Sequence, residues 1–276
     1  MALPDLSNSM YVARLRYIQT VHEPPARRNP DTLVRHFIPA LQRLRTAWMG
    51  EQELSRLRSD PFYYYLVART RYYDQVVDEA VAGGLDRLVG VGCGSDTRAY
   101  RFQEPLRGQG IKVLECDQAA SIEEKQRLTE RWRHFGHVEH LGIDLNDGAW
   151  PKLEAWLGVR KPRALLLMEG VSPYVNSDAM KQFLRLLATR LAPGSPVAYD
   201  FKIGGVHDDF GRVGRTDTPF RLWSDRGEVA AFHDALGLHL EDMEMSSALV
   251  RRLLPDLNGS VPVFEEDGLL RLRVKG

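Results

Sequence analysis

Hydrophobic residues recur every three or four positions through the first eighty residues of the chain, which is the period of an α-helix. The segment 31–49 carries this spacing at Leu33, Phe37, Ile38, Leu41, Leu44 and Trp48. The segment 61–84 continues it and ends on Gly83 and Gly84, where helices commonly stop. The pattern predicts that residues 1–84 form a helical cap belonging to the same globule as the rest of the chain.

After Gly84 the pattern changes to short apolar runs that alternate with amphipathic segments. The apolar runs predict strands at 85–91, 111–117, 140–145, 163–169, 195–201, 238–245 and 269–275, the last as an edge strand. The segments between them predict helices at 96–102, 121–135, 148–159, 177–191 and 227–236. Such alternation predicts an α/β fold, a doubly wound and mostly parallel sheet, over residues 85–276.

Residues 202–225 interrupt this alternation with Gly, Asp, Arg and aromatic side chains. The segment follows the strand predicted at 195–201, and so leaves the sheet at the edge where ligands bind in such folds. We expect a lid there, with Phe210, Phe220 and Trp223 lining a ligand cavity. The alternative is that these aromatic side chains only hold the loop against the core.

Composition excludes several classes of protein. The 276 residues carry 37 basic and 37 acidic side chains, a balance that gives no electrostatic case for nucleic acid or an anionic membrane. The apolar run 164–168 is far too short to cross a bilayer, and the N-terminal segment lacks the apolar stretch of a signal peptide. Cys93 and Cys116 cannot build a disulfide framework, so we expect a cytoplasmic location with both thiols as buried fillers. The scattered histidines predict no metal site.

Chemistry gathers where the predicted strands end. Gly92 and Gly94 follow the first strand and precede the polar helix start 95–97. Asp117 ends the second strand, 23 positions after Gly94, where a carboxylate commonly accepts from a ribose diol. Asp144 follows the third strand and Glu169 ends the fourth. One acidic residue at a strand end would be ordinary, but this set predicts an adenosine ligand.

The spacing argues against a dinucleotide. A Gly-x-Gly-x-x-Gly turn needs a third glycine for close packing of helix on strand, and Thr97 occupies that place. A Walker lysine is also missing, so a phosphate cradle has no support. A ligand with adenosine and an amino-acid tail but no phosphates fits better, which predicts S-adenosylmethionine.

Longer motifs carry a family resemblance. The string "VGVGCGSDTRAYRF" resembles the motif L-G-x-G-x-D-T-R-x-(Y/F)-R of the leucine carboxyl methyltransferase-like family of class I methyltransferases. The strings "ARTRYYD", "ECDQAASIEEK", "GIDLND" and "LLLMEGVSPYV" are similar to further segments of that family, in the same order. The departures are residues 118–120, where a proline is usual, and Val91 before the glycine. The resemblance implies a Rossmann-like methyltransferase that binds S-adenosylmethionine.

Carried over residue by residue, the resemblance gives the methionyl end of the cofactor to charged side chains. Arg69 would pair with the cofactor carboxylate, with Arg71 as the nearby alternative. Glu169 would approach the methionyl amino group. The competing interpretation is that Arg69 only pairs with Asp74 on the same predicted helix.

The resemblance assigns the rest of the cofactor to the glycine turn and to two strand ends. Gly92 and Gly94 would lie under the methionine and the ribose. Asp117 would bind the ribose diol, and Asp144 with Leu145 would border the adenine.

The methyl acceptor is specified less well. The resemblance implies O-methylation of a carboxylate or hydroxyl on a small molecule such as a natural-product intermediate, with Tyr174 facing the substrate. A carboxylate needs no general base, whereas a phenol would need one. We name His207 as the candidate, and Asp208, Asp209 and His233 could also serve; the alternative is that these are solvated loop residues. The alternatives are a protein C-terminal carboxyl methyltransferase or a non-catalytic cofactor-binding subunit. The oligomeric state stays open.

Overall fold

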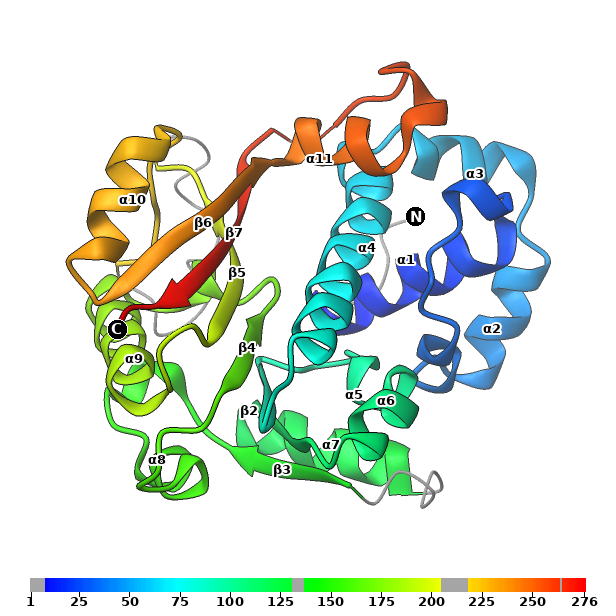
Figure 1. Ribbon diagram of the computed structural model, residues 1–276. Helices are drawn as coiled ribbons and strands as arrows, with labels where there is room; N and C mark the ends of the chain where they lie inside the picture. The colour runs from blue at the N-terminus through cyan, green and yellow to red at the C-terminus, as the bar shows by residue number, and fades with distance from the viewer. Residues whose placement is uncertain (1–7, 131–136, 205–217, 264) are drawn as a thin grey trace.

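The computed structural model describes residues 8–130, 137–204, 218–263 and 265–276. In this part of the chain a seven-stranded sheet has the order β3-β2-β1-β4-β5-β7-β6 (Figure 1). The strands are β1 (Arg87–Val91), β2 (Lys112–Asp117), β3 (Val138–Gly142), β4 (Ala164–Met168), β5 (Pro196–Lys202), β6 (Leu238–Met245) and β7 (Asp267–Val274). β1 to β5 run parallel, which confirms the predicted doubly wound, mostly parallel α/β sheet.

The position of the last strand was predicted wrongly. β7 lies inside the sheet, antiparallel to β5 on one side and to β6 on the other, and β6 forms the edge. Leu269, Leu270 and Leu272 are fully buried, as expected for a strand covered on both faces and flanked by neighbours. β6 instead alternates buried and exposed positions in its first half. The order of the strands along the chain therefore predicted the wrong edge strand, and the buried leucines mark β7 as an inner strand.

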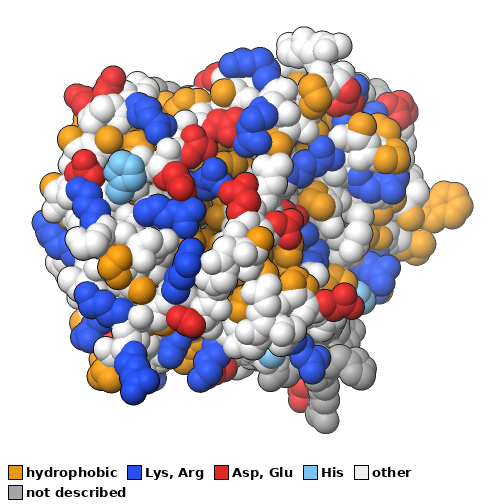
Figure 2. Space-filling view, viewed as in Figure 1, with side chains coloured by type: hydrophobic (Ala, Val, Ile, Leu, Met, Phe, Trp, Pro, Cys, Tyr) orange, Lys and Arg blue, Asp and Glu red, His pale blue; other side chains and the backbone are white. Residues whose placement is uncertain are grey.

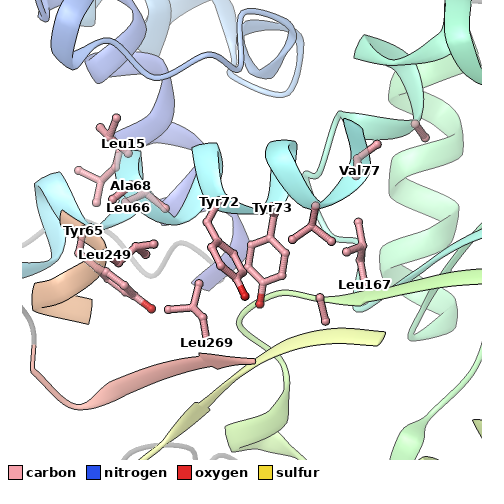
Figure 3. Close-up of a cluster of buried hydrophobic side chains, with 14 of the residues drawn as sticks. Leu15, Tyr65, Leu66, Ala68, Tyr72, Tyr73, Val77, Leu167, Leu249 and Leu269 are labelled. Carbon is pink, nitrogen blue, oxygen red and sulfur yellow. The ribbon is translucent and has the colours of Figure 1, made fainter. Parts of the chain in front are cut away.

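Helices cover both faces of the sheet, and alternate residues of each strand point to opposite cores. On one face α4 (Pro61–Ala82) packs on the sheet and separates it from α1 (Asn8–His22) and α3 (Glu51–Arg58) (Figure 1). Tyr65, Tyr72 and Tyr73 of α4 meet Leu167 and Leu269 of the strands in this core (Figure 3). On this side of the sheet lie also α2 (Ala40–Ala47), α5 (Arg98–Arg101), α6 (Gln103–Gly108), α7 (Ala119–Thr129) and α11 (Ser246–Leu253) (Figure 1).

The opposite face is covered by three further helices, on the left of Figure 1. They are α8 (Pro151–Leu157), α9 (Ser177–Arg190) and α10 (Arg226–Asp234). Their core includes Val89 and Leu166, the neighbours in sequence of residues that face α4. None of the described helices is long and apolar enough to cross a membrane. On the face shown in Figure 2, basic and acidic side chains are intermingled, without a broad patch of one sign.

The helix predicted across 31–49 is broken. A 3₁₀ turn, η2 (Leu33–His36), ends before Pro39, which caps the start of α2. Proline has no amide hydrogen and disfavours helix in the residue before it, which explains the break. As a result, the apolar side chains predicted to share one helix face do not share one environment. Phe37 and Ile38 are buried, whereas Leu41, Leu44 and Trp48 are exposed.

The predicted lid is only partly described, because residues 205–217 lie outside the described residues, and with them His207, Asp208, Asp209 and Phe210. Further along, Pro219 bridges to Asn176 and Leu222 to Ile203. Phe220 is 1% exposed, and its ring lies 6.2 Å from that of Tyr199 in the core. Phe220 thus holds the loop to the core, which favours the alternative interpretation for this residue.

Candidate functional site

A cavity of about 440 Å³ opens at the carboxyl ends of β1, β4 and β5. This is the edge at which open α/β sheets bind ligands, and the volume lies in the usual range for small-molecule sites. The glycine turn after β1, the segment after β4 and the end of β5 form one side. Residues of α1 and of the start of α4 form the other. The cavity therefore lies between the sheet and the N-terminal helices.

Strand register explains why particular residues meet at this edge. Val91, the last residue of β1, pairs with Cys116 and with Met168, and Met168 pairs with Tyr199. The next residue on each strand therefore falls in one row: Gly92, Asp117, Glu169 and Asp200. The sequence analysis had identified the first three members, but Asp200 was missed because it lies inside the predicted strand "SPVAYDF".

The turn after β1 requires glycine at two positions. Gly92 has φ +64°, and a β-carbon there would stand 2.1 Å from Val171 Cγ2. Gly94 has φ +35°, and its amide donates to Asp117 Oδ2 at 2.8 Å. A β-carbon on Gly94 would approach Ser9 of α1 to 3.2 Å, so the N-terminal helix lies directly over the turn. Both glycines line the cavity.

Gly90, inside β1, is a lining residue that sequence reasoning did not single out. A β-carbon on Gly90 would meet nothing within 4 Å, so a side chain there would project into the space of the cavity. A glycine inside a strand commonly marks a close approach of a ligand or another backbone, which was the available signal.

Arg69 of α4 reaches across the cavity to the sheet. Its Nε donates to Glu169 Oε1 at 3.0 Å and its Nη1 to Asp200 Oδ2 at 3.2 Å. Asp74, the alternative partner, instead binds Arg98 and Arg101. All three members of the Arg69–Glu169–Asp200 cluster line the cavity. Arg71, the nearby alternative, donates to backbone carbonyls and is not part of the lining.

Glu169 is ionised by its neighbours despite its burial. Desolvation by itself raises the pKa of a carboxyl, but Arg98 and Arg69 outweigh it and lower the pKa of Glu169. Arg98 Nη1 donates to Glu169 Oε2 at 2.7 Å and to Asp96 Oδ2 at 2.7 Å. The site therefore presents a fixed negative charge beside the Arg69 guanidinium.

The D-T-R-x-Y-R string that carried the family resemblance connects the N-terminal helices to the sheet. Arg98 binds Asp74 of α4 as well as Glu169 and Asp96. Thr97 Oγ1 donates to buried Asp31 at 2.5 Å, and Asp31 also accepts from Arg16 Nη1 at 2.8 Å. These residues position the site, a role that the motif alone did not reveal.

Asp117, Asp144 and Leu145, the other residues predicted to bind the cofactor, are not among the residues that line the described cavity. Asp117 ends β2, and its second oxygen accepts from Gln118 N at 2.7 Å. Asp144 caps a 3₁₀ turn, η4 (Leu145–Asp147), where Leu145 is buried. The structure thus brings Arg69, both glycines and Glu169 to one cavity and leaves Asp117, Asp144 and Leu145 on its β2–β3 flank.

Residues of β5 and β7 also line the cavity. Tyr174, in the 3₁₀ turn η5 (Ser172–Tyr174), lines it together with Phe62, Phe201 and Lys202. Lys202 Nζ lies 2.7 Å from Asp267 Oδ1. Burial lowers the pKa of Lys202, partly offset by Asp267. This part of the lining combines apolar side chains with charges that are already paired.

The two cysteines and His233 are core residues. Cys93 and Cys116 are both buried, as predicted, and burial raises the pKa of each thiol. His233 Nε2 shares a hydrogen bond of 2.5 Å with Tyr199 Oη. The His233 side chain is fully buried and is not among the residues that line the cavity. His233 is therefore not placed to act as a base. In the described part of the chain, no group of three His, Cys, Asp or Glu residues could hold a metal ion.

The donor set fits S-adenosylmethionine. An amino-acid tail needs a cation for its carboxylate and an anion for its amino group, and Arg69 and Glu169 offer both side by side in the cavity. Gly90 leaves room for a ligand at the sheet surface. The apolar and aromatic part of the lining suits a ligand that carries a ring system.

Comparison with known proteins points the same way. Residues 9–188 match the leucine carboxyl methyltransferase family. A protein from Streptomyces avermitilis, named as a candidate S-adenosyl-L-methionine-dependent methyltransferase, is 27% identical over 77% of this chain and 74% of its own. A protein of the same description from Mycolicibacterium paratuberculosis is 31% identical over 62% of this chain and 58% of its own.

Among solved structures, magnesium protoporphyrin IX methyltransferase from Synechocystis PCC 6803 has a TM-score of 0.47 at 15% identity, covering 88% of this chain and 99% of that one. The family match spans most of the chain and includes the glycine turn, Arg69 and Glu169. The chain belongs to the leucine carboxyl methyltransferase family and is an S-adenosylmethionine-dependent methyltransferase.

Proposed function

We propose that the chain transfers the methyl group of S-adenosylmethionine to an oxygen atom, a carboxylate or a hydroxyl, of a small molecule such as a natural-product intermediate. One observation carries the proposal. A single cavity is lined by the glycine turn, by the Arg69–Glu169 pair and by the apolar side chains of Phe62, Tyr174 and Phe201. Such a cavity has space for an acceptor beside the cofactor, with its walls supplied by the N-terminal helices and the sheet.

Arg69 would bind the methionyl carboxylate, and Glu169 the methionyl amino group. Gly92 and Gly94 would lie under the methionine and ribose, Asp117 would accept from the ribose diol, and Asp144 with Leu145 would border the adenine. When bound, the cofactor supplies an activated methyl group. The chain's own task is then to align the acceptor oxygen and to exclude water.

We propose that residues 1–84 act as a cap on the core formed by residues 85–276. Arg16 of α1 donates to Ser95 O at 3.0 Å, beside the glycine turn. Tyr11 and Phe62 reach the cavity from the cap. These contacts support a small acceptor, since a protein terminus would have to pass the same side chains. Tyr174 would contact the acceptor, and His207 stays a candidate base from the segment outside the described residues.

Methyl transfer tests the proposal directly. With radiolabelled S-adenosylmethionine, we expect product on small carboxylic acids or hydroxyl compounds and none on a leucine-terminated peptide. Label on the peptide would favour the protein C-terminal carboxyl methyltransferase. Tight binding of S-adenosylhomocysteine with no transfer to any acceptor would favour a non-catalytic cofactor-binding subunit.

Asp117→Ala tests the assignment of the ribose. Loss of a charge-assisted hydrogen bond costs about 1.5–3 kcal/mol, so the dissociation constant for S-adenosylhomocysteine should rise about ten- to a hundredfold. Asp234→Ala, an exposed carboxylate paired with Lys275, is the control and should leave binding unchanged. Titration calorimetry measures both, and equal constants for the two variants would remove Asp117 from the site.

A further inference from the structure

Asp200 is a buried carboxyl in the cavity that the binding scheme above does not use. It is 3% exposed and lies near the end of β5, where the strand meets the cavity. Its Oδ1 accepts from Gly170 N at 2.7 Å and its Oδ2 from Arg69 Nη1 at 3.2 Å. A buried carboxyl held by an amide and a shared guanidinium, with its side chain in the cavity lining, is placed to contact an acceptor.

The basic side chains in the described lining of the cavity all have carboxylate partners. Among the described lining residues they are Arg16, Arg69 and Lys202. Arg16 pairs with Asp31, Arg69 with Glu169 and Asp200, and Lys202 with Asp267. The described lining carboxylates are more numerous: Asp60, Asp96, Glu169, Asp200 and Asp267. Among the described lining residues an acceptor carboxylate would find only cations that already have a carboxylate partner, whereas a neutral hydroxyl needs none.

Proton affinity at Asp200 is set by groups from several elements. Burial raises the pKa of Asp200 to about 6, with Arg69 opposing the rise and Asp267 and Glu169 adding to it. Lys202 and the hydroxyls of Tyr65 and Tyr73 also face it. A cofactor carboxylate on Arg69 would weaken the guanidinium's hold on Asp200 and raise this pKa towards neutrality, the range that suits a general base.

We propose that Asp200 is the catalytic proton acceptor and that the methyl acceptor is a hydroxyl compound, a phenol in preference to a carboxylic acid. The inference rests on the proposed function and narrows it. The hydroxyl oxygen forms the new bond to the methyl carbon while the methyl–sulfur bond breaks. The hydroxyl proton passes to Asp200, and the sulfur keeps the electron pair of the broken bond.

The test compares the wild type with Asp200→Asn and the surface control Asp234→Asn. The acceptors, assayed at pH 8, are a 4-alkylphenol, 4-nitrophenol and the matching benzoates. At that pH 4-nitrophenol is ionised and the alkylphenol is not. We expect transfer to the alkylphenol and not to the benzoates, and slower transfer to 4-nitrophenol, because its phenolate is an anion as the benzoates are. Asp200→Asn should slow transfer to the alkylphenol about a hundredfold or more, the usual loss for a general base. It should slow transfer to 4-nitrophenol much less, because that acceptor has no proton to lose.

Binding of S-adenosylhomocysteine gives a second readout that needs no turnover. Calorimetry at pH 6.5 in buffers of different ionisation enthalpy should show proton uptake by the wild type and by Asp234→Asn. Asp200→Asn should show none, and at pH 8 it should bind S-adenosylhomocysteine more tightly than the wild type, because an ionised Asp200 competes with the ligand carboxylate for Arg69.

Equal losses with both phenols would make Asp200 a structural residue and overturn the inference, as would unchanged proton uptake in Asp200→Asn. Methylation of benzoates in place of phenols, or no transfer to any phenol, would overturn it as well. Transfer to benzoates would leave the proposed O-methylation intact. Failure to bind S-adenosylhomocysteine at all would instead contradict the proposed function itself.

Discussion

Replacing Arg98 by Met should destabilise the fold through stranded charges. Arg98 is 2% exposed and donates to Asp74 at 2.8 Å and to Asp96 and Glu169 at 2.7 Å. Arg69 and Arg101 still partner Glu169 and Asp74 in the variant, but every one of the three carboxylates loses a cation. Breaking a buried ion pair from one side costs about 3–5 kcal/mol, and we expect a loss of unfolding free energy in that range.

Urea unfolding followed by circular dichroism measures the loss. With a slope of about 3 kcal/mol per molar urea, the midpoint should fall by about 1–2 M at pH 7. The control is Arg252→Met, whose half-exposed guanidinium binds Glu244 at 2.7 Å. An exposed pair of that kind contributes about 0–1 kcal/mol, so the control midpoint should hardly move.

The pH dependence identifies the cause of the loss. Arg98 holds the pKa of Asp96 and of Glu169 below their usual range, so these carboxylates stabilise the wild type above about pH 4, and that stabilisation fades as the pH falls through their lowered pKa values. In the variant the stranded carboxylates take up protons at higher pH. The deficit against the wild type should therefore shrink on acidification from pH 7 to pH 5. A constant deficit, or a midpoint equal to that of the control variant, would refute the reasoning.

Two further outcomes follow from backbone geometry and from a buried imidazole. Gly92→Ala should lose about 2–4 kcal/mol of unfolding free energy, because φ is positive there and the new β-carbon would stand 2.1 Å from Val171. Gly84→Ala, with φ +79° in open space, should lose about 1 kcal/mol. Equal losses in urea unfolding would exclude the steric contribution. Burial lowers the pKa of His233 to about 4, so the neutral imidazole stabilises the fold fully above pH 6.5, and this stabilisation falls by about 2 kcal/mol at pH 5. Thermal unfolding of His233→Asn should therefore depend less on pH than that of the wild type. An unchanged pH dependence would argue against a buried neutral His233.

The sequence predicted the parts of the fold that depend on local pattern. Period-two and fully apolar runs located the strands, and the glycine turn with Glu169 located the ligand edge, because the carboxyl ends of parallel strands share one edge of a sheet. The place of β7 was not predictable from order along the chain, since a strand can insert between two others. The break at Pro39 was readable and was overlooked.

The missed site residues depend on contacts between distant segments. Asp200 joins the site only through the register of β4 with β5, and Arg98 only through α4 and the end of β4. Asp31 binds Thr97 from 66 positions away. No local pattern marks such partners. The strongest available signal was the family resemblance of the string at 96–101, which indicated importance without stating what each side chain touches.

A crystal structure with S-adenosylhomocysteine would show whether the cavity beside Arg69 and Glu169 is the cofactor site. We expect the ligand in the cavity between α4 and the sheet, with its carboxylate on Arg69, its amino group on Glu169 and its sulfur facing the apolar side chains near Tyr174. Asp200 should then lie open to the space beside the sulfur. A ligand bound outside this cavity, or one whose carboxylate and amino group contact neither Arg69 nor Glu169, would show that the cofactor site has been assigned wrongly.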